Sequence, residues 1–278
     1  MSLISLLPNP TLLGRYTLNE EISSTLDSKP PESSSAKKRP NLSVLHGLMQ
    51  KKVWYTDATS YWEDPSNCTA DVEGILGGFG SLSPVDIKGS GKFVEDVLMP
   101  SFPPSSYKMD KGGNTRLGRV LDLGGGIGRV SKHLLSGYFS SVTMMEVSPR
   151  LCKAASEYVN ECSNVEVVNT GMEGWRDFNG VDVVWAQWCI GHFTDGDFVD
   201  FLIAAREGMG EGGKVVVKDN VAVREELFVY DEEDSSVTRS EGYLDAVFAT
   251  GGWRRLGKWE QEWPEELFPV PIIMYGKA

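Results

Sequence analysis

The fold class of this chain is decided by the stretch Val120-Leu121-Asp122-Leu123-Gly124-Gly125-Gly126-Ile127-Gly128-Arg129. It reads as a buried parallel strand that breaks into a glycine turn and continues into a predicted helix over residues 130–135. Glycines at alternate positions let the backbone approach a ligand closely, and the N-terminus of the following helix favours negatively charged groups. Glycine turns after strands also serve as plain connectors, so the turn indicates a ligand site without identifying the ligand.

The spacing of this turn differs from the dinucleotide-binding fingerprint. Counted from Gly124, the form G-x-G-x-x-G needs glycine or alanine at its sixth position, where this chain has the bulky cation Arg129. Asp122 can face the α-amino group of a nucleoside that carries an amino-acid tail, and Arg129 can bind its carboxylate through two hydrogen bonds. We therefore expect S-adenosylmethionine as the cofactor, bound by Asp122, Gly124, Gly126 and Arg129.

Strands alternate with helices after the glycine turn. The sequence predicts strands over 141–147, 165–169, 181–187 and 214–219, and helices over 149–160 and 197–209. An acidic loop, a helix over about 240–249 and two strands near 255–262 and 270–275 are expected to follow. This alternation predicts an α/β, Rossmann-like fold with a parallel sheet covered by helices on both faces.

The chain before the glycine turn is expected to fall into two parts. Residues 1–43 are rich in serine, proline and lysine and predict a disordered extension, in which the basic run at 37–39 is a solvated linker or a nuclear localisation signal. Residues 44–278 form the folded domain, beginning with a helical lid over about 44–100. Within the lid we expect a helix that starts at Tyr61-Trp62, is interrupted near Pro65 and ends at Gly77, and a second helix over 90–98. A polar loop is expected over 108–116.

Composition excludes several classes of protein. The 278 residues suit one domain with extensions, and no run of eighteen apolar residues predicts a membrane span. The formal charge of −12 argues against a nucleic-acid backbone as substrate, because phosphate contacts need clustered cations. Three histidines with scattered acids give no metal-ligand spacing, and the four cysteines lack a C-x-x-C pair, which predicts reduced thiols inside the cell.

Candidate binding residues stand just after the predicted strands, where ligands of such sheets bind. Glu146 follows the glycine turn by about twenty residues, the spacing at which an acid accepts both ribose hydroxyls; alternatively it is an ordinary strand-end acid. Met172 and Glu173 follow the strand predicted over 165–169, where an adenine edge would pass, although Glu173 can equally be solvated. The strand predicted over 181–187 ends at Gln187 and is followed by Trp188 and His192. The Asn/Asp-Pro-Pro-aromatic turn of enzymes that methylate nucleic-acid bases is absent there.

These segments together resemble the protein α-N-terminal methyltransferases, which act on N-termini that begin Xaa-Pro-Lys or Xaa-Pro-Arg. The resemblance runs from Tyr61 to about Val237 and departs from the family in the long N-terminal extension, an extra loop near 108–115, and Glu146 where the family often has aspartate. It implies a seven-stranded class I methyltransferase sheet, with S-adenosylmethionine as methyl donor and S-adenosylhomocysteine as product. The matching segments are Tyr61-Trp62, Ile75-Leu76-Gly77-Gly78-Phe79-Gly80, the glycine turn through Arg129, Gln187-Trp188-Cys189-Ile190-Gly191-His192, Lys218-Asp219-Asn220 and Asp234-Ser235-Ser236-Val237.

The resemblance also implies how the amine is activated. Methyl transfer needs a neutral amine, and a free α-amine has a pKa near 8 against about 10.4 for lysine, so a modest base suffices. In the family, the equivalents of Asp234 and His192 do this work. Other interpretations remain: His192 can be a structural histidine, and Asp231-Glu232-Glu233-Asp234 can be a solvated acidic turn.

The remaining roles follow from the same resemblance. Trp188 would pack against the proline at the second position, unless it and Trp62 only fill the core. Asn220 would bind the first peptide carbonyl, and Asp231 with Ser236 would bind the cation at the third position. Further residues are expected in the cofactor site (Gln187, Trp62), on the floor of the substrate site (Leu76, Gly77, Leu82) and in the closing lid (Tyr61, Trp62).

The function expected from the resemblance is methylation of the α-amine of proteins with an Xaa-Pro-Lys/Arg N-terminus, including ribosomal proteins, in the cytoplasm and the nucleus. No nucleic acid, membrane or metal is expected as a partner. Two alternatives are a small-molecule N- or O-methyltransferase on the same fold and a catalytically silent binding module. The silent module conflicts with the complete set of Asp122, Arg129, His192 and Asp234.

Overall fold

The computed structural model describes residues 42–50, 53–109, 112–223, 227–263 and 269–278. Residues 1–41 of the expected N-terminal extension, with their basic run, lie outside the described residues, and helix α2 begins at Leu42. Within the described part, no helix has the length and apolar character needed to cross a membrane.

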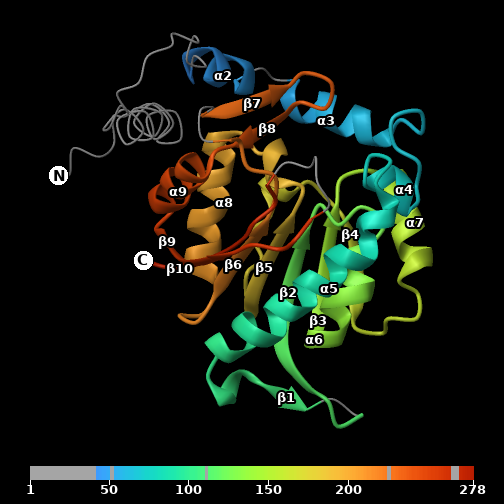
Figure 1. The fold of residues 1–278 in the computed structure, drawn as a ribbon, viewed down its shortest axis with the longest axis vertical. Helices are drawn as coiled ribbons and strands as arrows, with labels where there is room; N and C mark the ends of the chain where they lie inside the picture. Colours follow the sequence, from blue (N-terminus) through green and yellow to red (C-terminus); the bar gives the residue numbers. More distant parts are fainter. Residues whose placement is uncertain (1–41, 51–52, 110–111, 224–226, 264–268) are drawn as a thin grey trace, which may run out of the picture.

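A mixed sheet forms the centre of the molecule (Figure 1). Seven strands lie side by side in the order β4-β3-β2-β5-β6-β10-β9, and all neighbours are parallel except the two pairs that involve β10. This arrangement confirms the predicted α/β fold with its seven-stranded class I sheet. The strands are β2 (Thr115–Leu123), β3 (Phe139–Glu146), β4 (Val165–Asn169), β5 (Val181–Gln187), β6 (Lys214–Lys218), β9 (Trp253–Trp259) and β10 (Ile272–Lys277).

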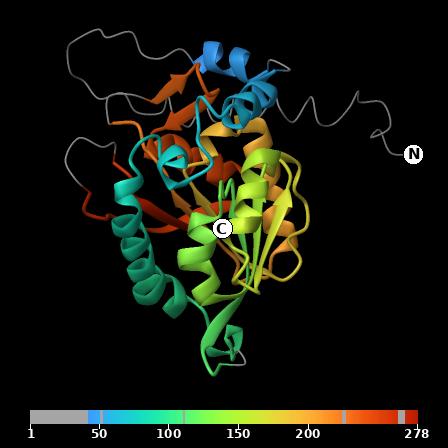
Figure 2. The same cartoon turned by 90° about the vertical axis from the view of Figure 1, so that its right-hand side faces the viewer.

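Helices cover both faces of the sheet (Figures 1 and 2). On one face α8 (Asp195–Gly208) and α9 (Glu241–Thr250) pack against the sheet in the larger apolar core. On the other face lie α5 (Ser83–Phe93), its π-helical continuation η3 (Val94–Leu98), η6 (Ser131–Leu135) and α6 (Ser136–Tyr138). Because both faces are covered, β5 and β6 consist of nearly continuous buried residues, as parallel strands do. Helix α7 (Pro149–Tyr158) lies beside β3 and β4.

The region predicted as a helical lid begins with α2 (Leu42–Met49), α3 (Trp54–Glu63), α4 (Val72–Ile75) and the 3₁₀ turn η2 (Gly80–Leu82). The prediction that a helix starts at Tyr61-Trp62 is wrong, because these residues end α3. Asp64 has an extended backbone at φ −77° and ψ 118°, as expected for a residue that precedes proline, so the helix stops before Pro65. The predicted glycine stop after α4 is confirmed by the positive φ of 57° at Gly77.

The second lid helix starts earlier than predicted. It begins at Ser83 and not at Ser90, because Pro84 suits the first helical turn and the buried residues Asp86, Ser90 and Phe93 recur at helical spacing. It then continues without a break into η3, followed by the 3₁₀ turns η4 (Met99–Ser101) and η5 (Pro104–Ser106).

Two segments predicted as loops contain strands. Residues in the expected loop at 108–116 form β1 (Lys108–Met109), which pairs with the start of β2. The acidic loop after Asp219 contains β7 (Phe228–Asp231) and β8 (Ser236–Arg239), an antiparallel hairpin whose turn carries the acids. The hairpin lies beside α3, above the sheet (Figure 1). The sequence pattern could not indicate this position.

Candidate active site

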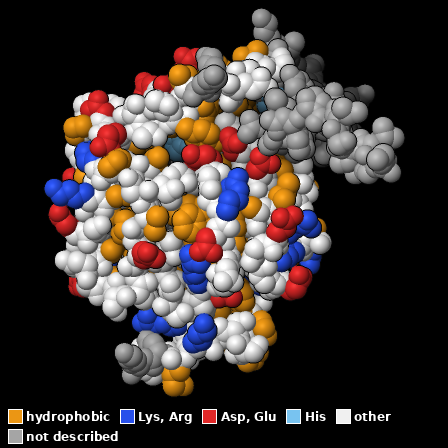
Figure 3. Space-filling view, turned by 180° about the vertical axis from the view of Figure 1, so that it is seen from behind, with side chains coloured by type: hydrophobic (Ala, Val, Ile, Leu, Met, Phe, Trp, Pro, Cys, Tyr) orange, Lys and Arg blue, Asp and Glu red, His pale blue; other side chains and the backbone are white. Residues whose placement is uncertain are grey.

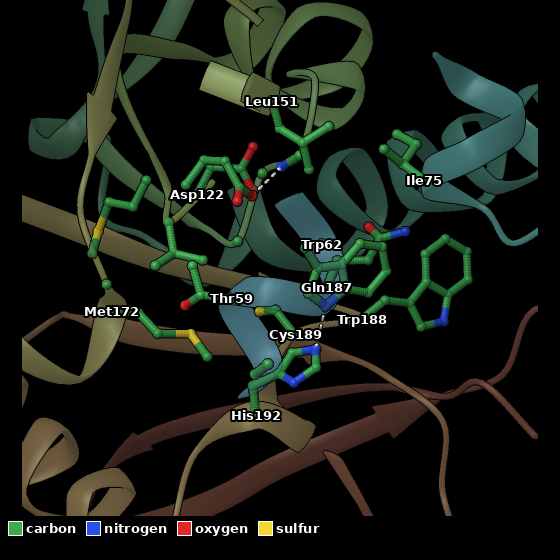
Figure 4. Close-up of a pocket in the computed structure, with 18 of the residues that line it drawn as sticks. Thr59, Trp62, Ile75, Asp122, Leu151, Met172, Gln187, Trp188, Cys189 and His192 are labelled. Atoms are coloured by element: carbon green, nitrogen blue, oxygen red, sulfur yellow. Dashed lines mark hydrogen bonds between the residues drawn. The ribbon is translucent and has the colours of Figure 1, made fainter. Parts of the chain in front are cut away.

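One pocket lies at the carboxyl ends of β2, β3 and β5, beside the point where the strand order reverses between β2 and β5 (Figure 4). This is where open α/β sheets bind their ligands. The pocket contains most of the predicted site residues, from the lid as well as from the sheet. They are Trp62, Leu76, Asp122, Gly124, Gly126, Arg129, Glu146, Met172, Glu173, Gln187, Trp188 and His192.

The glycine turn forms one wall of this pocket. Gly124 has a φ of 55°, and a Cβ there would lie 2.6 Å from the Cβ of Cys189. The backbone N–H of Gly126 donates to Oε2 of Glu146 at 3.0 Å, and that of Ser148 donates to Oε1 at 2.8 Å. Each carboxylate oxygen keeps a second lone pair, so Glu146 can still accept ribose hydroxyls.

Both buried acids of the pocket have raised pKa values. Burial raises the pKa of Glu146 to about 7, against the opposing hydrogen bonds from backbone N–H groups. Burial likewise raises the pKa of Asp122 to about 7, although its Oδ2 accepts a hydrogen bond from Ser131 Oγ at 2.6 Å. A ligand ammonium group beside Asp122 would favour the ionised carboxylate, which fits the amino-acid tail of S-adenosylmethionine.

A buried cluster of charges behind the pocket was not predicted from the sequence. Asp86 of α5 lies 2.7 Å from Arg129 Nη1 and 2.5 Å from Lys218 Nζ, and all three side chains are almost fully buried. Gln187 Nε2 also donates to both carboxylate oxygens of Asp86, at 3.0 and 2.9 Å. Two cations face one anion, and the net positive charge beside the pocket fits the carboxylate of the cofactor. The only hint in the sequence is the i, i+4 spacing of Asp86 and Ser90 on the buried face of α5.

Arg129→Lys is expected to weaken the binding of S-adenosylhomocysteine by about 10–100-fold, the equivalent of one charge-assisted hydrogen-bond pair. Lysine keeps the charge but loses the planar fork, so it cannot bind Asp86 and the cofactor carboxylate in the same way. Isothermal titration calorimetry measures the affinity, with Arg254→Lys on the exposed side of β9 as the control. An unchanged dissociation constant would show that Arg129 serves Asp86 alone.

Trp188 follows β5 in an unusual backbone conformation. Its φ is 53°, which is rare for a bulky residue and is held here by a hydrogen bond from its N–H to the carbonyl of Lys218. The guanidinium carbon of Arg129 lies over its ring, 5.7 Å from the centroid, and the ring of Trp263 is 6.1 Å away at an angle of 52°. The strained turn therefore places the indole of Trp188 in the wall of the pocket.

His192 lies on the next turn, η8 (Ile190–His192). The indole N–H of Trp62 donates to its Nε2 at 3.0 Å, the bond drawn in Figure 4. Its Nδ1 is buried and has no hydrogen-bond partner among the described residues. Burial lowers the pKa of His192, and the negative charge of Asp234 and the backbone carbonyls of Ser235 and Asp234 oppose part of this shift. The lowered pKa favours the neutral imidazole.

The backbone around His192 is held by three hydrogen bonds from two side chains. Arg239 of β8 donates to the carbonyl of Ile190 at 3.2 Å and to that of Phe193 at 2.7 Å. Trp54 of α3 donates to the carbonyl of His192 itself at 2.8 Å. Arg239 is in turn paired with the buried Asp195 at 2.9 Å. The turn that carries His192 is thus tied to the β7–β8 hairpin.

The other predicted residues lie beside the pocket and not in its wall. Asp234 stands in the turn of the hairpin, and its Oδ1 is buried with no hydrogen-bond partner among the described residues. The pKa of Tyr61 is raised by burial and by the charges of Asp234, Glu233 and Asp231, which places Tyr61 next to this turn. Further predicted residues outside the pocket wall are Asn220 after β6, Asp231 at the end of β7, Ser236 at the start of β8, Gly77 after α4 and Leu82 at the end of η2.

The fold and this pocket define a class I methyltransferase that uses S-adenosylmethionine. The family described as AdoMet-dependent proline di-methyltransferase matches residues 50–276, and the chain belongs to this family. The chain is 36% identical over 255 residues to alpha N-terminal protein methyltransferase 1 of Arabidopsis thaliana, covering 89% of this chain and 88% of that protein. It is 37% identical over 225 residues to N-terminal Xaa-Pro-Lys N-methyltransferase 1 of Danio rerio, covering 79% and 94%.

The fold is also similar to that of a solved S-adenosylmethionine-dependent methyltransferase from Leishmania major. The TM-score is 0.71 at 25% sequence identity, covering 88% of this chain and all of that one. The protein is therefore an enzyme, and the predicted family and cofactor are confirmed.

Proposed function

We propose that this enzyme transfers methyl groups from S-adenosylmethionine to the free α-amino group of proteins whose N-terminus begins Xaa-Pro-Lys or Xaa-Pro-Arg. One observation carries the proposal: an unpaired, buried carboxylate oxygen of Asp234 lies in an acidic turn next to Tyr61, at the side of the cofactor pocket. The names of the relatives in Arabidopsis and Danio support the same activity. Ribosomal proteins with such N-termini are the substrates we propose to test first.

The cofactor would be held from both ends. We assign Asp122 to its ammonium, Arg129 to its carboxylate and Glu146 to its ribose, with Met172 and Glu173 near the adenine. Gly124 and Gly126 allow close approach of the backbone, and Trp62 and Gln187 complete the wall. S-adenosylmethionine supplies a methyl group on a positively charged sulfur. The protein has to bring a neutral amine into line with that carbon and exclude water.

The peptide would enter over the acidic turn. The carboxylates of Asp231 and Asp234 attract its ammonium and the cation of its third residue, and Ser236 adds a hydrogen bond. We assign the face of Trp188 to the proline ring, Asn220 to the first carbonyl, and Leu76 and Gly77 to the floor. Tyr61 at the end of α3 covers the entrance. Asp234 and His192 are the groups that handle the proton of the amine.

A peptide that begins Ser-Pro-Lys is expected to gain methyl groups on its α-amine, whereas its acetylated form and a Ser-Gly-Lys form gain none. Acetylation removes the nucleophilic lone pair, and glycine leaves the indole face of Trp188 without a ring to pack against. Mass spectrometry of the three peptides after incubation with S-adenosylmethionine reads the result. Equal methylation of Ser-Gly-Lys, or of a small free amine, would contradict the proposed specificity.

A further inference from the structure

The hydrogen bond between Trp62 and His192 restricts which nitrogen of the imidazole carries its proton. An indole N–H only donates, so Nε2 of His192, 3.0 Å away, must offer its lone pair. The proton of the neutral ring is then on Nδ1. We infer that Trp62 is a positioning residue that fixes the Nδ1–H tautomer, which makes His192 a hydrogen-bond donor and leaves Asp234 as the acceptor of the substrate's proton. This inference rests on the proposed function.

The opposite tautomer meets an obstacle in the pocket. For Nδ1 to act as a base, the proton would have to sit on Nε2 and face the N–H of Trp62. Two donors would then oppose each other across 3.0 Å, and at least one would be left unsatisfied in a buried place. Taking up a second proton to form the imidazolium would also break the bond to Trp62, and burial of the ring lowers its pKa and opposes that step.

The hairpin offers the acceptor that His192 lacks. Oδ1 of Asp234 and Nδ1 of His192 are both buried, and neither has a hydrogen-bond partner among the described residues. One is an acceptor and, in the fixed tautomer, the other is a donor. The groups that face them are Trp62 and Tyr61 from α3 and the backbone carbonyls of Asp234 and Ser235 from the turn. Of the two residues expected to handle the proton, only Asp234 therefore has a lone pair free to receive it.

The proton and electron pairs balance in this scheme. One N–H bond of the substrate ammonium breaks, its proton joins Asp234, and the electron pair stays on nitrogen. That pair forms the new N–C bond as the C–S bond breaks and its electrons stay on sulfur. Asp234 then returns the proton to solvent. His192 keeps its Nδ1 proton throughout and uses it only to donate a hydrogen bond to an oxygen of the hairpin turn.

The tautomer can be read directly by ¹⁵N NMR of the whole protein labelled in its histidines. The sequence has three histidines, His46, His133 and His192, so the signals of His192 are identified by their absence in His192→Asn. We expect the shift of Nε2 to be that of an unprotonated acceptor and the shift of Nδ1 to be that of a protonated nitrogen. A protonated Nε2 in the unsubstituted protein overturns the inference, and His192→Asn is needed only to assign the signals.

Trp62→Phe tests whether the indole N–H sets the tautomer. Phenylalanine keeps a ring but loses the donor, so we expect the Nε2–H form of His192 to become populated. Trp175→Phe is the matched control, because it removes an indole donor whose 2.8 Å bond goes to the carbonyl of Asp177, away from His192. A tautomer unchanged in Trp62→Phe would show that Trp62 does not fix it.

Activity separates a donor from a base at His192. Asparagine places an amide N–H near the position of Nδ1, whereas glutamine places it near Nε2. If His192 donates, we expect His192→Asn to lower kcat on a Ser-Pro-Lys peptide by about 10-fold or less, the size of one hydrogen bond, and His192→Gln to lower it further. A loss of about 10²–10⁴-fold in His192→Asn, the size of a general base, overturns the inference. Failure of the unsubstituted enzyme to methylate the peptide would instead refute the proposed function and leave the NMR result standing.

Discussion

Asp234→Asn is expected to lower kcat on a Ser-Pro-Lys peptide by about 10²–10⁴-fold, the usual contribution of a general base. Asparagine has nearly the same shape but offers no basic oxygen, so the substrate ammonium would have to lose its proton to water. Affinity for S-adenosylhomocysteine should stay unchanged, because Asp234 is not part of the pocket wall that binds the cofactor. Steady-state kinetics by mass spectrometry gives kcat, and calorimetry gives the affinity.

Glu232→Gln is the matched control for this prediction. It removes one negative charge from the same hairpin turn, but Glu232 is exposed to solvent. We expect its kcat to stay within a few-fold of the unsubstituted value, as for a screened surface charge. If Glu232→Gln lost as much kcat as Asp234→Asn, catalysis would depend on the total charge of the turn, and Asp234 would not be the proton acceptor.

Asp86→Ala is expected to lower the free energy of unfolding by about 3–5 kcal/mol, because it leaves Arg129 and Lys218 buried without an anion. Both cations lie within 2.7 Å of this one carboxylate, and Lys218 is fully buried. Urea unfolding followed by circular dichroism measures the change. Asp96→Ala in the exposed part of η3 removes an acid from the adjoining helical segment without breaking this cluster, and it should change the stability little.

Removal of a second charge should partly reverse this loss. In the double variant Asp86→Ala with Lys218→Met, one unpaired cation disappears, so we expect the protein to be more stable than Asp86→Ala alone. If the single variant loses less than about 1 kcal/mol, the cluster is solvated or rearranged and does not hold Arg129 in place.

The sheet could be predicted because its signal is local. Strands β4 and β5 have the predicted bounds, since short apolar runs between turns define buried strands wherever they occur. The glycine turn could be predicted because its signal is also local: Gly124 and Gly126 adopt positive φ angles, which favour glycine. The pairing between β7 and β8 could not be predicted, because the strands are short and the acidic residues between them are typical of a loop.

From the strand pattern alone, the candidate site was predictable only where a residue stands at a strand end. The lid residues Trp62 and Leu76, which also line the pocket, were predicted through the family resemblance. Asp122, Glu146 and Gln187 follow from the topology of the sheet. Asp86 could not be predicted, because its partner Lys218 lies 132 positions further along the chain. The same is true of the bond between Trp62 and His192, which are 130 positions apart. Such contacts depend on how the lid packs onto the sheet.

The surface charges outside the acidic turn do not mark a binding site for a basic peptide. On the face turned to the viewer in Figure 3, Asp and Glu side chains are scattered among Lys and Arg side chains and do not form one field. The net charge of −12 would therefore draw a basic peptide toward the molecule in general, while Asp231 and Asp234 would fix where it binds.

The grip of Arg239 on both sides of His192 has a mechanical consequence. The guanidinium of Arg239 is paired with Asp195. It joins the β7–β8 hairpin, the rim of the site that would bind the third residue of a peptide, to the turn that carries His192. Because one guanidinium holds both, a displacement of that rim would also displace the turn that carries His192. We therefore expect a poorly matched peptide to lower turnover as well as affinity.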